Sequence, residues 1–389
     1  MICQHRKLRD IIMKILIAAD SFKGSLSSEE AGFCMAEGIQ RVLPNAEIQI
    51  LPLADGGEGT VQTIASYKNA SLQSCIVPDL LGRETICEYA LVDTQTAVIE
   101  TAAPCGLTKI AHPSPESICQ ATSYGLGVLL MKAAQKAKRI YVGLGGSGCN
   151  DGGIGLAQAL GWQFYDKSGE LIPNGCACLL NGISRIDNSK VDSQLKALEI
   201  IGISDVNSPL LGEKGCAMVF GAQKGMDAPL QQRFDAAMAD FARIVQQNIG
   251  INDINFPGAG AAGGLGFGLV CFAGGHLAPG IDTVLDIASF DTLLDQVDIV
   301  ITGEGRLDGQ SARGKVPSGV AKRAVKKNVP ALVVAGSFGN DWQDIFDCGI
   351  LDAQSAMLPG MDTKTAIQNA RTLVPDAAER LMRAWLEKR

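Results

Sequence analysis

The chain has 389 residues and a formal net charge of −7, with hydrophobic residues making up 47% and charged residues 19%. This composition is typical of a globular protein long enough for two domains, and it excludes a disordered chain. The acidic balance and the lack of a basic run argue against a nucleic-acid partner.

The N-terminal elements predict a parallel sheet. Residues 14–18 form a continuous apolar run, which is typical of a strand buried on both faces. Ser27 stands three residues before Glu30, and this capping box predicts the start of a helix. Residues 47–53 predict a second strand, followed by a loop and another helix. Strands that alternate with helices in this way favour parallel pairing.

The same alternation returns near the other end of the chain. Strands are predicted at 297–302, 331–335 and 353–357, with helices at 317–326 and 377–387. Two strands from the start and three from the end would make one five-stranded, flavodoxin-like α/β sheet.

The long middle segment predicts a second, mixed α/β domain inserted into the first. The expected boundaries are 14–64 with 286–389 for the flavodoxin-like domain and 65–285 for the insertion. Ligands often bind between domains, so a cleft is expected there. The insertion's predicted elements are strands at 72–77, 84–91, 97–101, 139–142 and 198–203 and helices at 125–137 and 154–160.

Loops rich in glycine and acids follow many of these strands. Glycine adopts positive φ and adds no bulk, so such loops suggest backbone that approaches a ligand; tight turns and helix caps are the alternative. Phosphoryl transfer needs donors and cations around the phosphates, carboxylates for Mg²⁺ and a group that orients the attacking hydroxyl. The loop acids are Asp20, Asp55, Glu58, Asp151, Asp205, Glu304 and Asp308.

Two segments approach known nucleotide-binding patterns. Residues 309–316 nearly match a Walker A loop, but Val316 replaces the hydroxyl residue, which leaves an anion site before a helix as the better interpretation. Residues 143–148 match a dinucleotide fingerprint, with Asp166 about twenty residues on. Asp151 follows that loop closely and would repel a pyrophosphate unless Mg²⁺ lay between them.

The cysteines and the N-terminus indicate a cytoplasmic protein. The twelve cysteines include no Cys-x-x-Cys pair and are expected to be reduced. The first twelve residues lack a signal-peptide core, and the uncharged stretch 254–275 holds too many glycines for a membrane span.

Six motifs together resemble the bacterial glycerate kinase family, in order from Met13 to about Gly339. Residues 1–12 lie outside that pattern. The motifs include Leu-Ala-Asp-Gly-Gly-Glu-Gly-Thr at 53–60 and Phe-Gly-Ala-Gln-Lys-Gly at 220–225, and the others lie at 13–27, 143–153, 257–266 and 300–308.

The resemblance implies an ATP- and Mg²⁺-dependent kinase that converts (R)-glycerate to 2-phosphoglycerate. Phosphorylation of the 3-hydroxyl stays open, as does an NAD-dependent oxidoreductase that uses the Gly143–Gly148 loop. A regulatory protein that binds a nucleotide or a sugar acid is the non-enzymatic alternative. No nucleic-acid or membrane partner is expected, and a homodimer is one candidate for the oligomeric state.

The candidate site combines residues from both predicted domains. The catalytic candidates are Lys23, Asp55, Asp151, Asp205 and Asp308, with Asp151 and Asp205 as the metal ligands. The substrate- or nucleotide-binding candidates are Asp20, Ser21, Gly56, Gly57, Glu58, Gly145, Gly146, Ser147, Asn150, Lys224, Glu304, Arg306 and Lys315.

Overall fold

The apolar run after Met13 forms strand β1 (Lys14–Ala19), in which Ile15, Leu16 and Ile17 are fully buried. Successive side chains of a strand point to opposite faces, so burial of all three requires cover on both sides of the sheet. The computed structural model describes residues 12–388, and apart from Ile12 the extension predicted at 1–12 lies outside them.

The chain forms two compact units, one made of the sequence up to Asp55 together with that from Gly280 onward, the other of Gly56–Pro279. The predicted boundaries fall a few residues later in both places. Helix α2 (Thr60–Ala65) packs on strands of the second unit, and helix α10 (Gly280–Ile287) packs on helices of the first. Both helices therefore belong to the unit on the other side of the predicted boundary.

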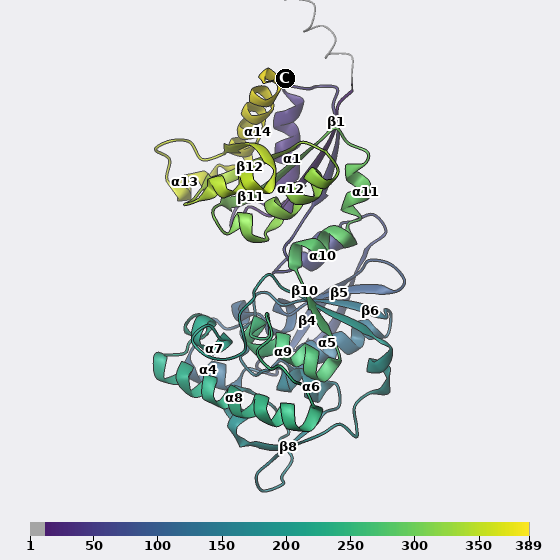
Figure 1. Ribbon diagram of the computed structural model, residues 1–389, viewed down its shortest axis with the longest axis vertical. Coiled ribbons are helices and arrows are strands. Elements are labelled where there is room, and N and C mark those ends of the chain that lie inside the picture. Colours follow the sequence, from purple (N-terminus) through teal and green to yellow (C-terminus); the bar gives the residue numbers. More distant parts are fainter. Residues whose placement is uncertain (1–11, 389) are drawn as a thin grey trace, which may run out of the picture. The chain divides into compact units, whose positions relative to one another are not determined.

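The first unit is the predicted flavodoxin-like α/β domain. Its sheet is parallel throughout, in the order β2-β1-β11-β12-β13, which is the flavodoxin order. Figure 1 shows the elements of this unit. They are β1, α1 (Ser28–Gln40), β2 (Glu47–Pro52), α10, α11 (Phe290–Leu294), β11 (Ile299–Leu307), α12 (Val316–Lys326), β12 (Ala331–Phe338), β13 (Ile350–Ser355), α13 (Thr363–Gln368) and α14 (Ala370–Glu387).

Helices α1 and α14 pack together over one face of this sheet, and their side chains share a core with Ile15 and Ile17 of β1. The predicted capping box starts α1: Ser27 Oγ accepts a hydrogen bond from Glu30 N at 3.2 Å, and Glu30 Oε2 accepts one from Ser27 N at 2.9 Å. Helix α14 begins earlier than predicted and continues through Pro375.

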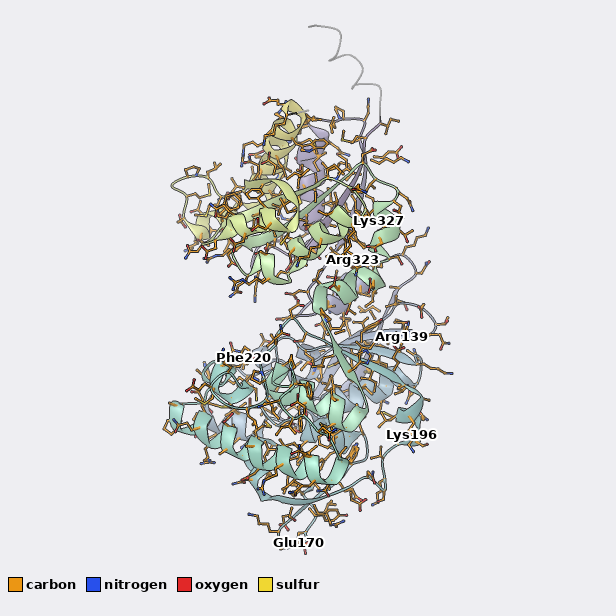
Figure 2. All side chains as sticks on the ribbon, viewed as in Figure 1. Arg139, Glu170, Lys196, Phe220, Arg323 and Lys327 are labelled. Atoms are coloured by element: carbon orange, nitrogen blue, oxygen red, sulfur yellow. A yellow bond between two sulfur atoms is a disulfide. The ribbon has the colours of Figure 1, made fainter. Side chains whose placement is uncertain are left out.

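Helix α12 packs on β11 and β12. Its Arg323, labelled in Figure 2, is the centre of an ion-pair group in which the guanidinium lies 2.7 Å from Asp286 Oδ1 and 3.2 Å from Asp291 Oδ1. These contacts join α12 to α10 and α11.

The second unit contains a six-stranded mixed sheet in the order β10-β9-β6-β5-β4-β3 and a separate hairpin of β7 and β8. Antiparallel pairing joins β3 to β4 and β4 to β5, and the remaining pairs of the six-stranded sheet are parallel. Its elements are α2, β3 (Ser71–Pro78), β4 (Glu84–Leu91), β5 (Thr96–Glu100), α3 (Ala102–Cys105), α4 (Pro115–Gln120), α5 (Tyr124–Ala134), β6 (Arg139–Gly143), α6 (Ile154–Ala159), β7 (Gln163–Asp166), β8 (Ile183–Asp187), β9 (Glu199–Ile203), α7 (Cys216–Phe220), α8 (Ala228–Ile249), α9 (Ala261–Ala273) and β10 (His276–Ala278).

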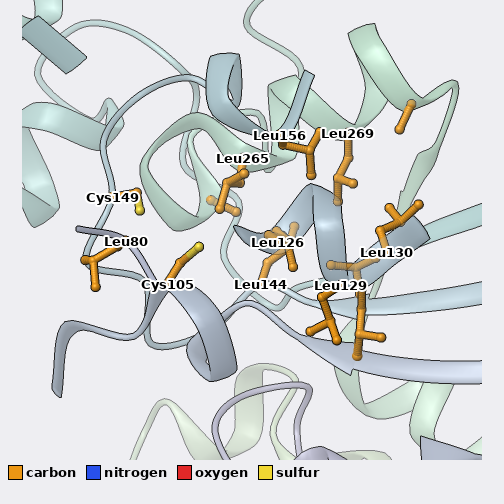
Figure 3. Packing of buried hydrophobic residues seen from close by; sticks show 14 of the residues in the cluster. Leu80, Cys105, Leu126, Leu129, Leu130, Leu144, Cys149, Leu156, Leu265 and Leu269 are labelled. Carbon is orange, nitrogen blue, oxygen red and sulfur yellow. The ribbon is translucent and has the colours of Figure 1, made fainter. Parts of the chain in front are cut away.

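The core of this unit is apolar and rich in leucine. In Figure 3, Leu126 and Leu130 of α5 belong to one buried cluster with Leu156 of α6 and Leu269 of α9.

No helix in the described part of the chain combines the length and apolar character needed to cross a bilayer.

One cysteine pair differs from the sequence expectation. Cys119 of α4 and Cys178 of a short 3₁₀ helix form a disulfide, with their Cα atoms 5.0 Å apart. The expectation of reduced cysteines is therefore wrong for this pair. The two residues lie 59 positions apart, so their spacing carried no sign of the bond.

We predict that Gly38→Ala destabilises the protein by ~1–3 kcal/mol. A Cβ at this position of α1 would lie 2.0 Å from the carbonyl oxygen of Pro375 in α14, so the two helices would have to separate. Alanine has a higher helix propensity than glycine, so the substitution would stabilise α1 if propensity alone mattered. A loss of stability would therefore come from the close packing of the two helices. Urea unfolding followed by circular dichroism measures the effect.

Gly182→Ala is the matched control, because nothing lies within 4 Å of the Cβ that it would add. Equal stabilities of the two variants would contradict the proposed packing of α1 on α14.

Candidate functional site

The carboxyl ends of β1, β2 and β11 bring three acids to one edge of the first unit's sheet. Asp20 directly follows β1, Asp55 lies in the loop after β2, and Glu304 lies within β11. These strands are neighbours, and the chain order reverses between β1 and β11. In sheets of this kind, ligands bind outside the carboxyl ends of the strands at such a reversal.

Asp20 is held in an environment that disfavours its negative charge. Burial raises the pKa of its carboxyl group to about 7, with further contributions from the charges of Asp55 and Glu304. A hydrogen bond that Ser21 N donates to Asp20 Oδ1 at 2.6 Å opposes the shift. A cation at this edge would therefore stabilise the ionised form.

The environment of Glu304 also disfavours a negative charge, because its side chain is only 5% exposed. Burial raises the pKa of its carboxyl group to about 7, while a hydrogen bond with Ser311 and the charge of Lys315 lower it. Lys315 precedes α12, and its Nζ lies 4.0 Å from Glu304 Oε2. The other oxygen, Oε1, has no hydrogen-bond partner within residues 12–388.

Arg306 lies near the end of β11, and Asp308 directly follows that strand. Arg306 Nε lies 3.8 Å from Asp308 Oδ2, and Asp308 Oδ1 accepts a hydrogen bond from Gln310 N at 3.0 Å. Lys23 and Ser21 are exposed in the loop after β1. Eight of the predicted site residues thus belong to this unit: Asp20, Ser21, Lys23, Asp55, Glu304, Arg306, Asp308 and Lys315.

Two predicted glycine loops pack directly on each other in the second unit. A Cβ on Gly143 would lie 2.7 Å from the oxygen of Gly56, and one on Gly145 would lie 2.7 Å from the Cα of Gly57. Only glycine allows this approach of the two backbones. Gly146 has a φ of 69° and follows in the same loop.

Glu100, at the end of β5, was missed by the sequence analysis. Its carboxylate accepts hydrogen bonds from Val61 N at 2.5 Å and Gly59 N at 3.3 Å, so it holds the loop that leads into α2. An acid at the end of a predicted strand was the available signal, the same one that selected the other loop acids.

Asp151 is completely buried, and hydrogen bonds occupy both of its carboxylate oxygens. Ser123 donates to Oδ2 from its backbone N and its Oγ, both at 2.8 Å, Gly155 N donates to Oδ2 at 3.3 Å, and Gly153 N donates to Oδ1 at 3.1 Å. Burial raises the pKa of this carboxyl group and these bonds lower it. The contacts connect the glycine loop with the starts of α5 and α6.

The neighbours of Asp151 are also buried. Lys224 is 2% exposed and donates a hydrogen bond from Nζ to the carbonyl oxygen of Cys149 at 2.5 Å, and burial lowers its pKa. Ser147 Oγ donates to the carbonyl oxygen of Ala262 at 3.2 Å. The side-chain amide of Asn150 makes no hydrogen bond within the described part of the chain.

Asp205 and Glu58 differ from this buried group. Both are exposed, Asp205 in the loop after β9 and Glu58 in the loop before α2. The predicted residues of the second unit therefore include both buried loop supports and exposed loop acids.

The topology removes the structural basis for a dinucleotide site at residues 143–148. In the dinucleotide-binding fold, an acidic residue lies about twenty residues after the glycine loop, at the end of the next parallel strand. Asp166 instead ends β7, which pairs antiparallel with β8 outside the main sheet. Its Oδ1 accepts hydrogen bonds from Ser168 N and Glu170 N within its own turn.

The described residues contain no group of three His, Cys, Asp or Glu side chains placed to hold a metal ion by themselves. Mg²⁺ commonly binds through one or two carboxylates together with substrate phosphates and water. The acids at the β1–β11 edge fit that mode of binding, since Glu304 Oε1 keeps an unused acceptor there.

Comparisons with a family model, with protein sequences and with solved structures point to the same family. Residues 15–386 match the glycerate kinase family. A glycerate kinase of Halalkalibacterium halodurans is 40% identical over 370 residues, which cover 94% of this chain and 97% of that protein. The glycerate 2-kinase of Escherichia coli is 36% identical, covering 90% and 92% of the two chains. A crystal structure described as a glycerate kinase 2 from Salmonella typhimurium LT2 has a TM-score of 0.85 and 35% identity, covering 97% and 99%.

We predict that Glu304→Gln reduces the dependence of stability on pH. An unfolded glutamate titrates near 4.5, whereas burial raises the folded pKa to about 7. The stability contributed by the protonated group is complete below about pH 4.5 and is lost as the pH rises through 7, because only the unfolded chain releases its proton in that window. The variant should gain on the order of 3 kcal/mol relative to the wild type between pH 4.5 and 8.

Urea unfolding in metal-free buffer measures this difference, with the exposed Glu47→Gln as the control. A difference that stays constant between pH 4.5 and 8 would contradict the shifted pKa of Glu304.

We predict that Asp151→Asn lowers the free energy of unfolding by ~1–3 kcal/mol. An amide supplies only one oxygen, so a donor among Ser123, Gly153 and Gly155 would lose its acceptor. The exposed Asp240→Asn serves as the control, since its carboxylate pairs with Arg243 one turn away on the same helix. Chemical denaturation tests this prediction, and equal stability of the Asp151→Asn and Asp240→Asn variants would contradict it.

Proposed function

This chain belongs to the glycerate kinase family, and we propose that it transfers the γ-phosphate of ATP to the 2-hydroxyl of (R)-glycerate, giving 2-phosphoglycerate. Membership of a kinase family makes the protein a phosphotransferase that uses ATP. The position of the phosphorylated hydroxyl and the enantiomer are the new parts of the proposal, with the 3-hydroxyl as the alternative.

The acid group at the β1–β11 edge supports the phosphoryl-transfer part of this proposal, and the likeness to the glycerate 2-kinase of Escherichia coli supports the choice of the 2-hydroxyl. Phosphoryl transfer depends on positioning and on neutralising charge rather than on covalent chemistry by the protein. The carboxyl groups of the half-buried Asp20 and the buried Glu304, with pKa values raised to about 7, are poised to accept a cation. The reversal in strand order puts them where this type of sheet binds its ligands.

Mg²⁺ would be held here by Asp20 and Glu304, together with phosphate oxygens and water. When bound, it would neutralise part of the charge that develops on the phosphate oxygens. The sequence analysis assigned the metal to Asp151 and Asp205. Because Asp151 already accepts four hydrogen bonds, we propose that it supports the glycine loop instead.

The acceptor hydroxyl needs a nearby carboxylate. We assign this role to Asp308, whose Oδ1 is fixed by Gln310 N and whose Oδ2 would accept the hydroxyl proton. Lys23 and Lys315 would neutralise the phosphates. The buried Lys224 would act through the backbone of the glycine loop that it contacts at Cys149.

A cytoplasmic location remains part of the proposal because ATP is the donor. A homodimer likewise stays a prediction from the sequence.

The direct experiment is phosphorus NMR of the product formed from ATP and D-glycerate with Mg²⁺. We expect the proton-coupled signal of a phosphate on a secondary carbon, a doublet. A triplet would show phosphorylation of the primary 3-hydroxyl, and no transfer to glycerate would overturn the proposed function.

We predict that Asp308→Asn lowers kcat by roughly 100-fold or more. The asparagine Oδ1 can still accept the hydrogen bond from Gln310 N, so the loop should keep its shape while the proton acceptor is lost. Steady-state kinetics and the melting temperature are measured together, with Asp240→Asn as the control. Turnover at the wild-type rate would remove Asp308 from the mechanism.

A further inference from the structure

A small open cavity lies at the carboxyl ends of β11 and β12 in the flavodoxin-like unit. Its volume is about 260 Å³, and its lining includes Arg306, Asp308, Arg313, Asn340 and Asp341. We call this cavity the arginine pocket. It includes part of the 309–316 segment that the sequence marks as an anion site, and the proposed function gives no role to Arg313.

Backbone hydrogen bonds hold the pocket walls in place. Gly309 N donates to the carbonyl oxygen of Asn340 at 3.0 Å, and Gly339 N donates to that of Leu307 at 2.7 Å. Arg313 N donates to the carbonyl oxygen of Gln310 at 2.9 Å. The two loops are therefore joined to each other, which reduces the cost of ordering them around a ligand.

Both guanidinium groups keep unused donors. Arg306 is 66% exposed in its side chain, and its closest acid oxygen, Asp308 Oδ2 at 3.8 Å, is beyond hydrogen-bond distance. Arg313 is exposed and forms no ion pair with any residue between 12 and 388. Arginine offers several donors in a fixed plane, a geometry that matches carboxylates and phosphates.

Gly339 allows Arg306 to lie across the backbone at the pocket. A Cβ there would come 2.8 Å from Arg306 Nε and 3.0 Å from the Cβ of Asp308. A side chain of any size at this position would therefore displace the guanidinium.

We propose that the arginine pocket binds an oxyanion through Arg306 and Arg313, and that in the proposed reaction this oxyanion is the carboxylate of glycerate. The lining holds two arginines together with two aspartates, Asp308 and Asp341, so the pocket suits a single negative charge better than a triphosphate. A carboxylate bound here would also bring the neighbouring hydroxyl of a three-carbon acid towards Asp308. The glycerate part of this inference rests on the proposed function.

The kinetic test compares Arg306→Gln and Arg313→Gln with Arg243→Gln, an exposed arginine on α8. Loss of a charged hydrogen bond should raise the KM for glycerate roughly 10- to 100-fold and leave the KM for ATP unchanged. Gly339→Ala should also raise the KM for glycerate, because the added methyl group displaces the guanidinium of Arg306 without removing it. Arg243→Gln should behave as the wild type.

A rise in the KM for ATP alone would instead identify a nucleotide phosphate as the oxyanion, and would overturn the assignment to glycerate. Unchanged KM values for both substrates in both arginine variants would contradict the proposal that the arginine pocket binds an oxyanion.

A binding test without turnover separates this inference from the proposed function. Trp342 follows Asp341 of the pocket and stacks on Phe338 with ring centroids 3.9 Å apart, so its fluorescence should report binding. Saturable quenching by D-glycerate or inorganic phosphate, lost in Arg313→Gln and in Trp342→Phe, supports the pocket even if the wild type proves to be inactive as a glycerate kinase. Absence of quenching by either anion in the wild type would refute it.

Discussion

The sheet of the flavodoxin-like unit forces three carboxyl groups to share one edge. Its strands β2, β1 and β11 are parallel neighbours, so Asp20, Asp55 and Glu304 reach the same place from distant parts of the sequence. Burial and the neighbouring negative charges raise the pKa of Asp20 and of Glu304. The unfavourable electrostatics are tolerated because fully buried strand residues such as Ile15 and Ile17 hold the sheet together below that edge.

In the second unit, two buried acids, Asp151 and Glu100, already use their carboxylate oxygens in hydrogen bonds. Asp151 is more deeply buried than Asp20, yet it accepts four hydrogen bonds and thereby fixes a loop. Glu100 does the same for the loop before α2. Burial alone therefore does not separate a ligand-binding acid from a supporting one. The separation comes from counting the donors that each carboxylate already uses.

The sequence predicts the features that depend on local pattern. Burial of β1 follows from its apolar run, and the start of α1 follows from Ser27 and Glu30. The long helix α8 was missed although Phe234, Met238, Phe241 and Val245 repeat at helical spacing, a signal that could have been used. The Cys119–Cys178 bond and the satisfied state of Asp151 depend on contacts between distant segments, so no local pattern could have predicted them.

Basic residues in the flavodoxin-like unit follow the same logic as the acids. Arg323 is 16% exposed and divides its donors among Asp282, Asp286 and Asp291, so its charge is fully used in joining α12 to its neighbours. Arg306 lies at the carboxyl edge with its donors largely unused. Both are arginines close to aspartates, but only the second can exchange water for a ligand without breaking the fold. Unused bonding capacity at the edge where parallel strands end is therefore the physical property that separates the proposed binding residues of this unit from its structural ones.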